Sequence, residues 1–280
     1  MKQIIIEHDV LEEIKKEHLQ YCLSKINKKK LKLSYDDCNN LFIENPFNDD
    51  FSVKNEYKKF KKKRFDFRQK YKHFRTPASK DQTWYAAKLI EKLNIRVCPY
   101  CGQQYFSTIT KENGNVVAEA SLDHFAAENE YYYLALNLYN LIPVCRSCNC
   151  TYKLADDRVI VNPYFEQLED YIEFSLDNHS IIKYFSDDED LKVNINIKKH
   201  IQRTQDHIDV LKLENRYNYY QNMIKTLIYK KEVMTQNYLD DLTEEINGKK
   251  ISLEDLILKQ DIFDENEPFM KFKLDIWKQL

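Results

Sequence analysis

The sequence is poor in several features that mark large classes of protein. It holds only three glycines in 280 residues and neither a dinucleotide-binding nor a Walker pattern, which argues against a Gly-rich phosphate loop. No apolar run approaches the roughly 18–20 residues that cross a bilayer, so we expect neither an integral membrane protein nor a membrane partner. The first nine residues carry charges within their apolar patch and lack a small-residue cleavage site, so no secretory signal is expected. These absences predict a cytoplasmic protein.

The residues that are present indicate a folded protein without disulfides. Apolar residues make up 43% of the chain and aromatic residues 13%, which excludes a wholly disordered protein. The length predicts one or two domains with a core that needs no cross-links. Seven cysteines, an odd number in a reducing compartment, favour metal ligands or buried thiols over a disulfide framework.

The net charge of −2 conceals an uneven distribution of charge along the chain. Residues 1–97 hold 23 Lys and Arg against 14 Asp and Glu, whereas residues 98–280 hold 20 against 31. The first third is therefore basic and the remainder acidic. This difference bears on binding partners more than on the fold.

The strongest basic run is residues 54–75, with eleven Lys and Arg, two acids and six aromatic residues. Lys61, Lys62, Lys63 and Arg64 lie at its centre and are candidates for nucleic-acid binding, because cations contact phosphates and aromatic rings stack on bases. An amphipathic helix with a solvated basic face and buried aromatic side chains fits the same pattern. The sequence leaves the two interpretations even.

Periodicity predicts an α+β protein in which a small module is embedded between two mainly α-helical regions. We expect a basic helical region at residues 1–95, the module at 96–165, and a helical region at 166–280 that packs on the module or binds a partner. Helical patterns are expected over residues 5–30, 81–93, 214–247, 251–259 and 269–280. Within the module, β-like runs at 105–110 and 116–122 flank Glu112-Asn113-Gly114-Asn115, a good hairpin turn signal.

Two C-x-x-C pairs carry the clearest chemical signal. Cys98 and Cys101 form the first pair, and Cys145 and Cys148 form the second. Two such pairs supply four thiolates to one tetrahedral ion, so we expect a closed, structural Zn²⁺ site that performs no catalysis. The alternatives are two redox motifs or incidental cysteines.

The segment between the two pairs holds a second group of polar residues. Asp123 and His124 end the second β-like run, and adjacent residues of a strand point their side chains apart. One of the two can therefore hold a metal ion while the other accepts a proton. A helix that opens at Cys148 would return Asn149 to the same point. An Asp-His pair on its own is more often a surface or structural feature.

The order of these motifs along the chain is distinctive. The motifs are CPYC (98–101), LDHF (122–125), YNLIPVC (139–145), CRSCN (145–149) and Lys153. In this order they resemble the HNH, or ββα-metal, endonucleases over about residues 96–153. Within that group, the sequence of residues 122–149 is similar to the HNH nuclease subunit of Septu-type and retron-associated anti-phage defence systems.

The resemblance implies roles for five residues. His124 matches the general base that activates water, and Asp123 matches the carboxylate ligand of a catalytic divalent ion. Asn149 stands where relatives place a second metal ligand, and oxygen ligands of this kind suit Mg²⁺ or Mn²⁺. Asn140 matches the middle Asn, which braces the loop and orients the base. Lys153 either contacts the scissile phosphate or caps a helix.

The resemblance also implies a function and a partner. It predicts an antiviral effector that hydrolyses phosphodiester bonds, with DNA preferred to RNA as substrate, and that works with an ATPase of the ABC or SMC type. The sequence has no ATP-binding motif of its own. A ribonuclease or tRNA nuclease on the same site is one alternative. A zinc-stabilised nucleic-acid-binding or adaptor protein without activity is the other.

The basic run yields the first testable prediction. Replacing Lys61, Lys62, Lys63 and Arg64 together by Ala should weaken DNA binding and flatten its dependence on salt, because fewer counterions are released. Filter binding or fluorescence anisotropy over a series of salt concentrations measures both quantities. Unchanged affinity and slope would assign this run to a solvated face.

Overall fold

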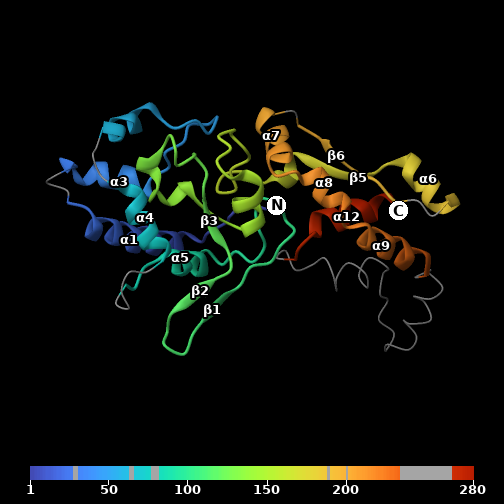
Figure 1. Cartoon of the computed structure of the whole chain (residues 1–280), viewed down its shortest axis with the longest axis horizontal. Helices are drawn as coiled ribbons and strands as arrows, with labels where there is room; N and C mark the ends of the chain where they lie inside the picture. The colour runs from blue at the N-terminus through green and yellow to red at the C-terminus, as the bar shows by residue number, and fades with distance from the viewer. Residues whose placement is uncertain (28–30, 63–65, 77–81, 188–189, 200, 234–266) are drawn as a thin grey trace.

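The computed structural model describes residues 1–27, 31–62, 66–76, 82–187, 190–199, 201–233 and 267–280 (Figure 1). In these residues, helices lie towards both ends of the chain together with three two-stranded antiparallel sheets. The predicted α+β class is confirmed. No helix within the described ranges has the length and apolar character that spanning a membrane requires.

The N-terminal region is helical, as predicted. Its elements are α1 (His8–Lys25), α3 (Tyr35–Ile43), η1 (Asn55–Lys62), α4 (Phe67–Arg75) and α5 (Ala86–Leu93). α1 begins later than the pattern over residues 5–30 predicted, because Glu7 has an extended ψ of 142°. α3 begins in a capping box, in which the side chains of Ser34 and Asp37 each accept the other's backbone N–H.

The basic run at residues 54–75 is not one helix. It is divided between the 3-10 helix η1 and α4, whose N-terminus is capped by the Asp66 carboxylate. Lys61 and Lys62 are exposed, whereas Lys63 and Arg64 lie outside the described residues. Five of its aromatic rings are buried: Tyr57, Phe60, Phe67, Tyr71 and Phe74. Those five rings pack in the core and do not offer a stacking surface for bases, so a nucleic-acid role for this run would depend on its cations.

The middle of the chain forms two separate hairpins. β1 (Thr108–Thr110) pairs with β2 (Val116–Ala118) across a turn where Gly114 has a φ of +79°. β3 (Ser121–His124) pairs instead with β4 (Leu141–Val144), with Asp123 opposite Ile142. The second β-like run was expected to continue into Asp123 and His124, but the chain changes partner between Ala118 and Ser121. Asp123 and His124 thus belong to the second hairpin.

The remaining elements of the module are short. They are η2 (Tyr132–Leu134), η3 (Leu138–Asn140) and η4 (Cys148–Lys153). The helix expected to open at Cys148 is present as the π-helix η4, which closes with a bond from the Leu154 N–H to the Asn149 carbonyl. η4 begins at Cys148, shortly after β4 ends at Val144. The elements β3, β4 and η4 therefore follow the order strand, strand, helix.

The C-terminal region is less helical than predicted. Its elements are η5 (Leu168–Asp170), β5 (Ile172–Leu176), α6 (Asn178–Asp187), β6 (Val193–Ile197), α7 (Gln202–Val210), α8 (Leu213–Asn218), α9 (Gln221–Val233) and α12 (Met270–Gln279). The hairpin of β5 and β6 was not predicted, although Ile172, Phe174 and Leu176 are buried with the alternation typical of a strand. α12 confirms the helix expected at 269–280, whereas the one expected at 251–259 lies outside the described residues.

Side chains of α12 protect the free edge of β5. The Asp275 carboxylate accepts the Phe174 N–H at 3.0 Å, and Gln279 accepts the Leu176 N–H and donates to the Phe174 carbonyl. These bonds satisfy backbone groups that an edge strand would otherwise leave open. α12 therefore anchors the last described residues to the C-terminal hairpin.

The core is continuous across the three regions expected from the sequence. Buried side chains from the N-terminal helices, the module and the C-terminal elements belong to one hydrophobic cluster. The N-terminal helices lie at one end of the molecule, β3 lies between the two ends, and α6, α9 and α12 lie towards the other end (Figure 1). The module is thus packed between its two flanking regions.

Gly102 gives a prediction about stability. Its φ is +64°, and a Cβ there would lie 3.0 Å from the Met1 Cγ and 3.2 Å from the Met1 nitrogen. Gly102→Ala should therefore lower the free energy of unfolding by about 2–4 kcal/mol, since it adds a clash to left-handed strain. Gly114→Ala is the matched control, because its φ is also positive but nothing lies within 4 Å, and it should cost only about 1 kcal/mol. Equal losses in urea unfolding would contradict this account of Gly102.

Candidate metal centre and the Asp123–His124 site

The four cysteines of the two C-x-x-C pairs meet in one buried cluster. The Sγ atoms of Cys98 and Cys148 are 3.9 Å apart, those of Cys101 and Cys145 are 3.8 Å apart, and all four lie within 4.8 Å of one another. Tetrahedral zinc with Zn–S bonds of about 2.3 Å would place its sulfurs about 3.8 Å apart. The cluster could therefore hold a structural metal ion such as zinc, as the spacing predicted.

Donors around the sulfurs also fit a thiolate site. The Cys145 N–H donates to the Cys98 Sγ at 3.3 Å, and the Cys148 N–H donates to the Cys145 Sγ at 3.5 Å. The turn after the first pair closes with a bond from the Gly102 N–H to the Cys98 carbonyl. Backbone donors that point at sulfur stabilise its negative charge, which a metal-bound thiolate requires.

Arg216 of α8 is an additional cation at this cluster that the sequence did not single out. Its Nη1 donates to the Cys148 Sγ at 3.4 Å, and its guanidinium lies 4.5 Å from the centre of the Tyr152 ring. Burial by itself lowers the pKa of Arg216, but the negative Cys101 and Cys148 sulfurs beside it raise the pKa overall. Four thiolates around one divalent ion leave an excess of negative charge, which this guanidinium offsets.

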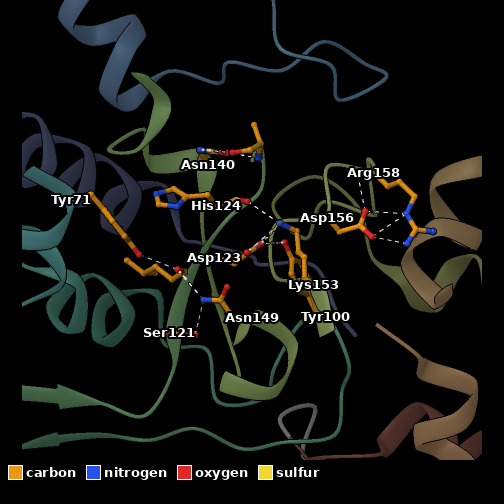
Figure 2. A network of polar contacts seen from close by, with 12 residues as sticks. Tyr71, Tyr100, Ser121, Asp123, His124, Asn140, Asn149, Lys153, Asp156 and Arg158 are labelled. Atoms are coloured by element: carbon orange, nitrogen blue, oxygen red, sulfur yellow. Dashed lines mark hydrogen bonds and ion pairs between the residues drawn. The ribbon is translucent and has the colours of Figure 1, made fainter. Parts of the chain in front are cut away.

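Asp123 is enclosed in a buried ion pair. The Lys153 Nζ lies 3.2 Å from its Oδ1 and 3.1 Å from its Oδ2, and both side chains are almost fully buried, at 2% and 3% exposure. The Tyr100 hydroxyl donates to the Oδ2 at 2.8 Å. Tyr100 stands between Cys98 and Cys101, so the metal cluster and the carboxylate share one short segment. Figure 2 shows the carboxylate pointing into this group.

His124 points away from that pair, toward the N-terminal helices (Figure 2). Its Nε2 lies 3.1 Å from the Ala135 carbonyl, which can only accept, so the Nε2 carries the proton and the Nδ1 of the neutral ring carries the lone pair that can accept one. The Tyr71 ring packs against the imidazole with centroids 4.4 Å apart. Burial lowers the pKa of His124, which keeps the ring neutral at pH 7.

Asn140 braces the loop that holds His124. Its Oδ1 accepts the Ala126 N–H at 2.7 Å, and its Nδ2 donates to the Leu134 carbonyl at 3.1 Å, with the side chain fully buried. This is the position that the resemblance implies for a residue that orients the base. The amide ties the two ends of the loop together, and the Ala135 carbonyl follows directly.

The same loop is bound by residues of the N-terminal region. The His18 Nε2 donates to the Leu136 carbonyl at 2.7 Å, and its Nδ1 accepts the Trp84 Nε1–H at 3.2 Å. Burial lowers the pKa of His18 to about 4, so this ring is neutral and its two bonds are fixed. Both ring nitrogens of His18 are therefore satisfied by protein partners. The Asn137 amide donates to three carbonyls at the end of α3.

Asn149 and Lys153 both bond to residues of β3. The Asn149 Nδ2 donates to the Ser121 Oγ at 3.0 Å and to the Leu122 carbonyl at 3.3 Å, at the start of β3 (Figure 2). Lys153 is buried against Asp123 and also donates to the His124 carbonyl at 3.0 Å. The sequence suggested a phosphate contact or a helix cap for Lys153, and it did not predict this buried ion pair.

Asp123, one of the two residues expected to hold a divalent ion, does not fit one as it is placed. The Asp123 carboxylate already receives Lys153 on both oxygens and Tyr100 on one. Within the described ranges, the four cysteines are the one group of three or more His, Cys, Asp or Glu side chains that could hold a metal. The geometry thus favours a structural metal centre at the four cysteines. It leaves no open carboxylate on Asp123 for the catalytic Mg²⁺ or Mn²⁺ that the resemblance implies.

Comparisons with protein-family models, with curated proteins and with solved structures found no match for the chain. The features of this chain that bear on function are therefore the motifs in its sequence and the contacts of the two sites. Those contacts join residues that stand up to 118 positions apart, such as His18 and Leu136.

The cluster predicts different effects for two neighbouring cysteines. Cys148→Ser should release bound metal and lower the Tm by on the order of 10 °C, because three thiolates hold a structural ion poorly. Cys150→Ser is the matched control, since Cys150 is exposed and lies outside the cluster, and it should retain full metal content. Elemental analysis and thermal unfolding measure the two quantities. Equal metal content in both variants would contradict the assignment of the four cysteines as metal ligands.

Proposed function

We propose that this protein is a nuclease of the HNH type that hydrolyses phosphodiester bonds, with DNA preferred to RNA as substrate. One observation carries the proposal. His124 lies at the end of β3 with its Nε2 held by the Ala135 carbonyl, so that its Nδ1 is available as a base. The motif order along the chain and the strand, strand, helix order of β3, β4 and η4 support the same assignment.

The chemistry assigned to His124 is proton abstraction from water. Phosphodiester hydrolysis at neutral pH needs a base that is unprotonated yet strong enough to activate the nucleophile. A histidine with its ordinary pKa near 6.5 is partly charged at pH 7, and burial shifts His124 toward the neutral form. The loop braced by Asn140 holds the ring in one tautomer, which keeps the lone pair on the same nitrogen.

Two further groups lie beside this base. Lys153 supplies a positive charge next to the His124 backbone, and Tyr100 and Lys153 keep Asp123 in place. The resemblance implies Mg²⁺ or Mn²⁺ on Asp123 and Asn149, but Lys153 and Tyr100 already occupy the Asp123 oxygens. The proposal for this site is therefore limited to the proton transfer by His124. A closed four-sulfur metal centre would fix Tyr100 and take no part in the reaction.

We further propose that the nuclease acts as the effector of an anti-phage complex with an ATPase of the ABC or SMC type. The basic first third of the chain would meet the nucleic acid, and the acidic remainder would pack against protein. The exposed Lys61 and Lys62 on η1 support the first part of this proposal. Any dependence on ATP would come from the partner, because this sequence has no ATP-binding motif.

The closed state of Asp123 favours a second candidate function. A buried carboxylate that is neutralised by Lys153 is also what a non-catalytic, zinc-stabilised binding or adaptor protein would contain. In that protein, His124 would be a structural residue like His18. Removing its imidazole would then leave the biological effect intact.

Replacing the base separates these functions. His124→Ala should reduce cleavage of plasmid DNA by about 100-fold or more, the usual contribution of a general base, while metal content stays unchanged. Cleavage is followed with Mg²⁺ or Mn²⁺ present, with plasmid and tRNA as parallel substrates, and with and without the partner ATPase. His8→Ala is the matched control, because His8 is exposed at the start of α1. This variant should cleave plasmid DNA like the wild type.

Four results would decide between the candidates. Loss of plasmid cleavage in His124→Ala supports the deoxyribonuclease, and loss of tRNA cleavage alone supports a ribonuclease on the same site. Wild-type cleavage by His124→Ala would contradict the assignment of the base. Absence of cleavage in every protein, together with an unchanged biological effect of His124→Ala, would support the adaptor.

A further inference from the structure

The Lys153 side chain occupies a position that a catalytic cation would need. Its Nζ lies within 3.2 Å of both Asp123 oxygens and 3.0 Å from the His124 carbonyl. Three acceptors from the end of β3 therefore surround one ammonium group. Together with the Tyr100 hydroxyl, these contacts leave the carboxylate enclosed at 3% exposure.

Lys153 is held there by the backbone as well as by charge. It is the last residue of η4, and Leu154 after it has a φ of +49°, in the left-handed region that non-glycine residues seldom adopt. The previous side chain, Tyr152, lies under the Arg216 guanidinium beside the cysteine cluster. The end of η4 is thus fixed on one side by the metal centre and on the other by Asp123.

A divalent ion and this ammonium compete for the same side of the Asp123 carboxylate. Mg²⁺ requires oxygen ligands at about 2.0–2.1 Å in octahedral geometry, which would bring it into contact with the Nζ. Both groups are positive, and burial removes the water that would screen their repulsion. Lys153 must leave the carboxylate before a divalent ion can bind to it.

We propose that Lys153 is the resident cation of Asp123 and closes this carboxylate to divalent metal ions for as long as the ion pair persists. The inference rests on the proposed function only in placing Asp123 at the reacting site. The ion pair then controls whether the site can bind a metal ion, because displacement of the Lys153 side chain would open the carboxylate. A conformational change that withdraws η4 would be sufficient.

Binding of Mn²⁺, measured without nucleic acid, tests this inference. The proteins are the wild type, Lys153→Met, Asp123→Asn, and the double variant Lys153→Met with Asp123→Asn, each with the cysteine cluster loaded with zinc. Electron paramagnetic resonance of free Mn²⁺ gives stoichiometry and affinity. Lys153→Met should bind one Mn²⁺ at least about tenfold more tightly than the wild type, and the double variant should lose that gain.

The double variant is the matched control, because it has the same methionine and no buried charge. If Lys153→Met leaves an unpaired carboxylate that prevents folding, the comparison of wild type with Asp123→Asn decides alone. The two should then bind Mn²⁺ equally poorly. Tight wild-type binding that Asp123→Asn abolishes would overturn the inference, as would equal Mn²⁺ affinity of wild type and Lys153→Met.

These outcomes are separate from the fate of the proposed function. The titration contains no substrate, so a closed carboxylate would be found in a nuclease and in an adaptor alike. Conversely, failure of His124→Ala to change cleavage would remove the proposed function and leave the Mn²⁺ result standing.

Discussion

The meeting of four cysteines in one buried cluster is the constraint on which the rest of the molecule depends. It joins the turn at Cys98 to the turn at Cys145, on either side of the two hairpins. The C-terminal region then docks on the first of these turns: the His207 Nε2 donates to the Tyr100 carbonyl, and the Tyr217 hydroxyl donates to the Cys101 carbonyl. Arg216 adds a bond to sulfur. Loss of the cluster would loosen three regions at once.

The cluster also reaches the candidate site through a single side chain. Tyr100 lies within the first cysteine pair and donates to Asp123, and Asp123 pairs with Lys153 at the end of η4, which begins at Cys148. The cysteine cluster and the buried carboxylate are therefore linked both through the Tyr100 side chain and through η4. A buried ion pair is a weak source of stability, because desolvation offsets most of the attraction.

His124 depends on a different set of supports. The carbonyls of Leu134, Ala135 and Leu136 are taken in succession by Asn140, His124 and His18. The N-terminal helices thus help to orient the proposed base, and Tyr71 of the basic run packs on its ring. That run contributes a buried aromatic to the site and exposed lysines to the surface, which is the pattern expected of a solvated basic face. Its binding to nucleic acid stays a prediction.

The sequence by itself determined the α+β class, the four cysteines that could hold a metal ion, the β1–β2 hairpin and the helices α1, α5 and α12. These follow from local patterns, since C-x-x-C spacing, helical periodicity and an Asn-Gly turn each act over a few residues. It also brought Asp123, His124 and Asn140 into one candidate group by their motifs. The roles of those residues in catalysis stay predictions.

Only the tertiary structure decided how these residues are partnered. The change of strand partner before Ser121, the β5–β6 hairpin, Arg216 at the sulfurs and Lys153 on Asp123 all join segments distant in sequence. No local pattern encodes such pairs, because a charged side chain looks alike in a sequence whether it is solvated or buried. Whether Asp123 faces a metal ion or an ammonium is set by which neighbour the fold brings within 3.2 Å of its oxygens.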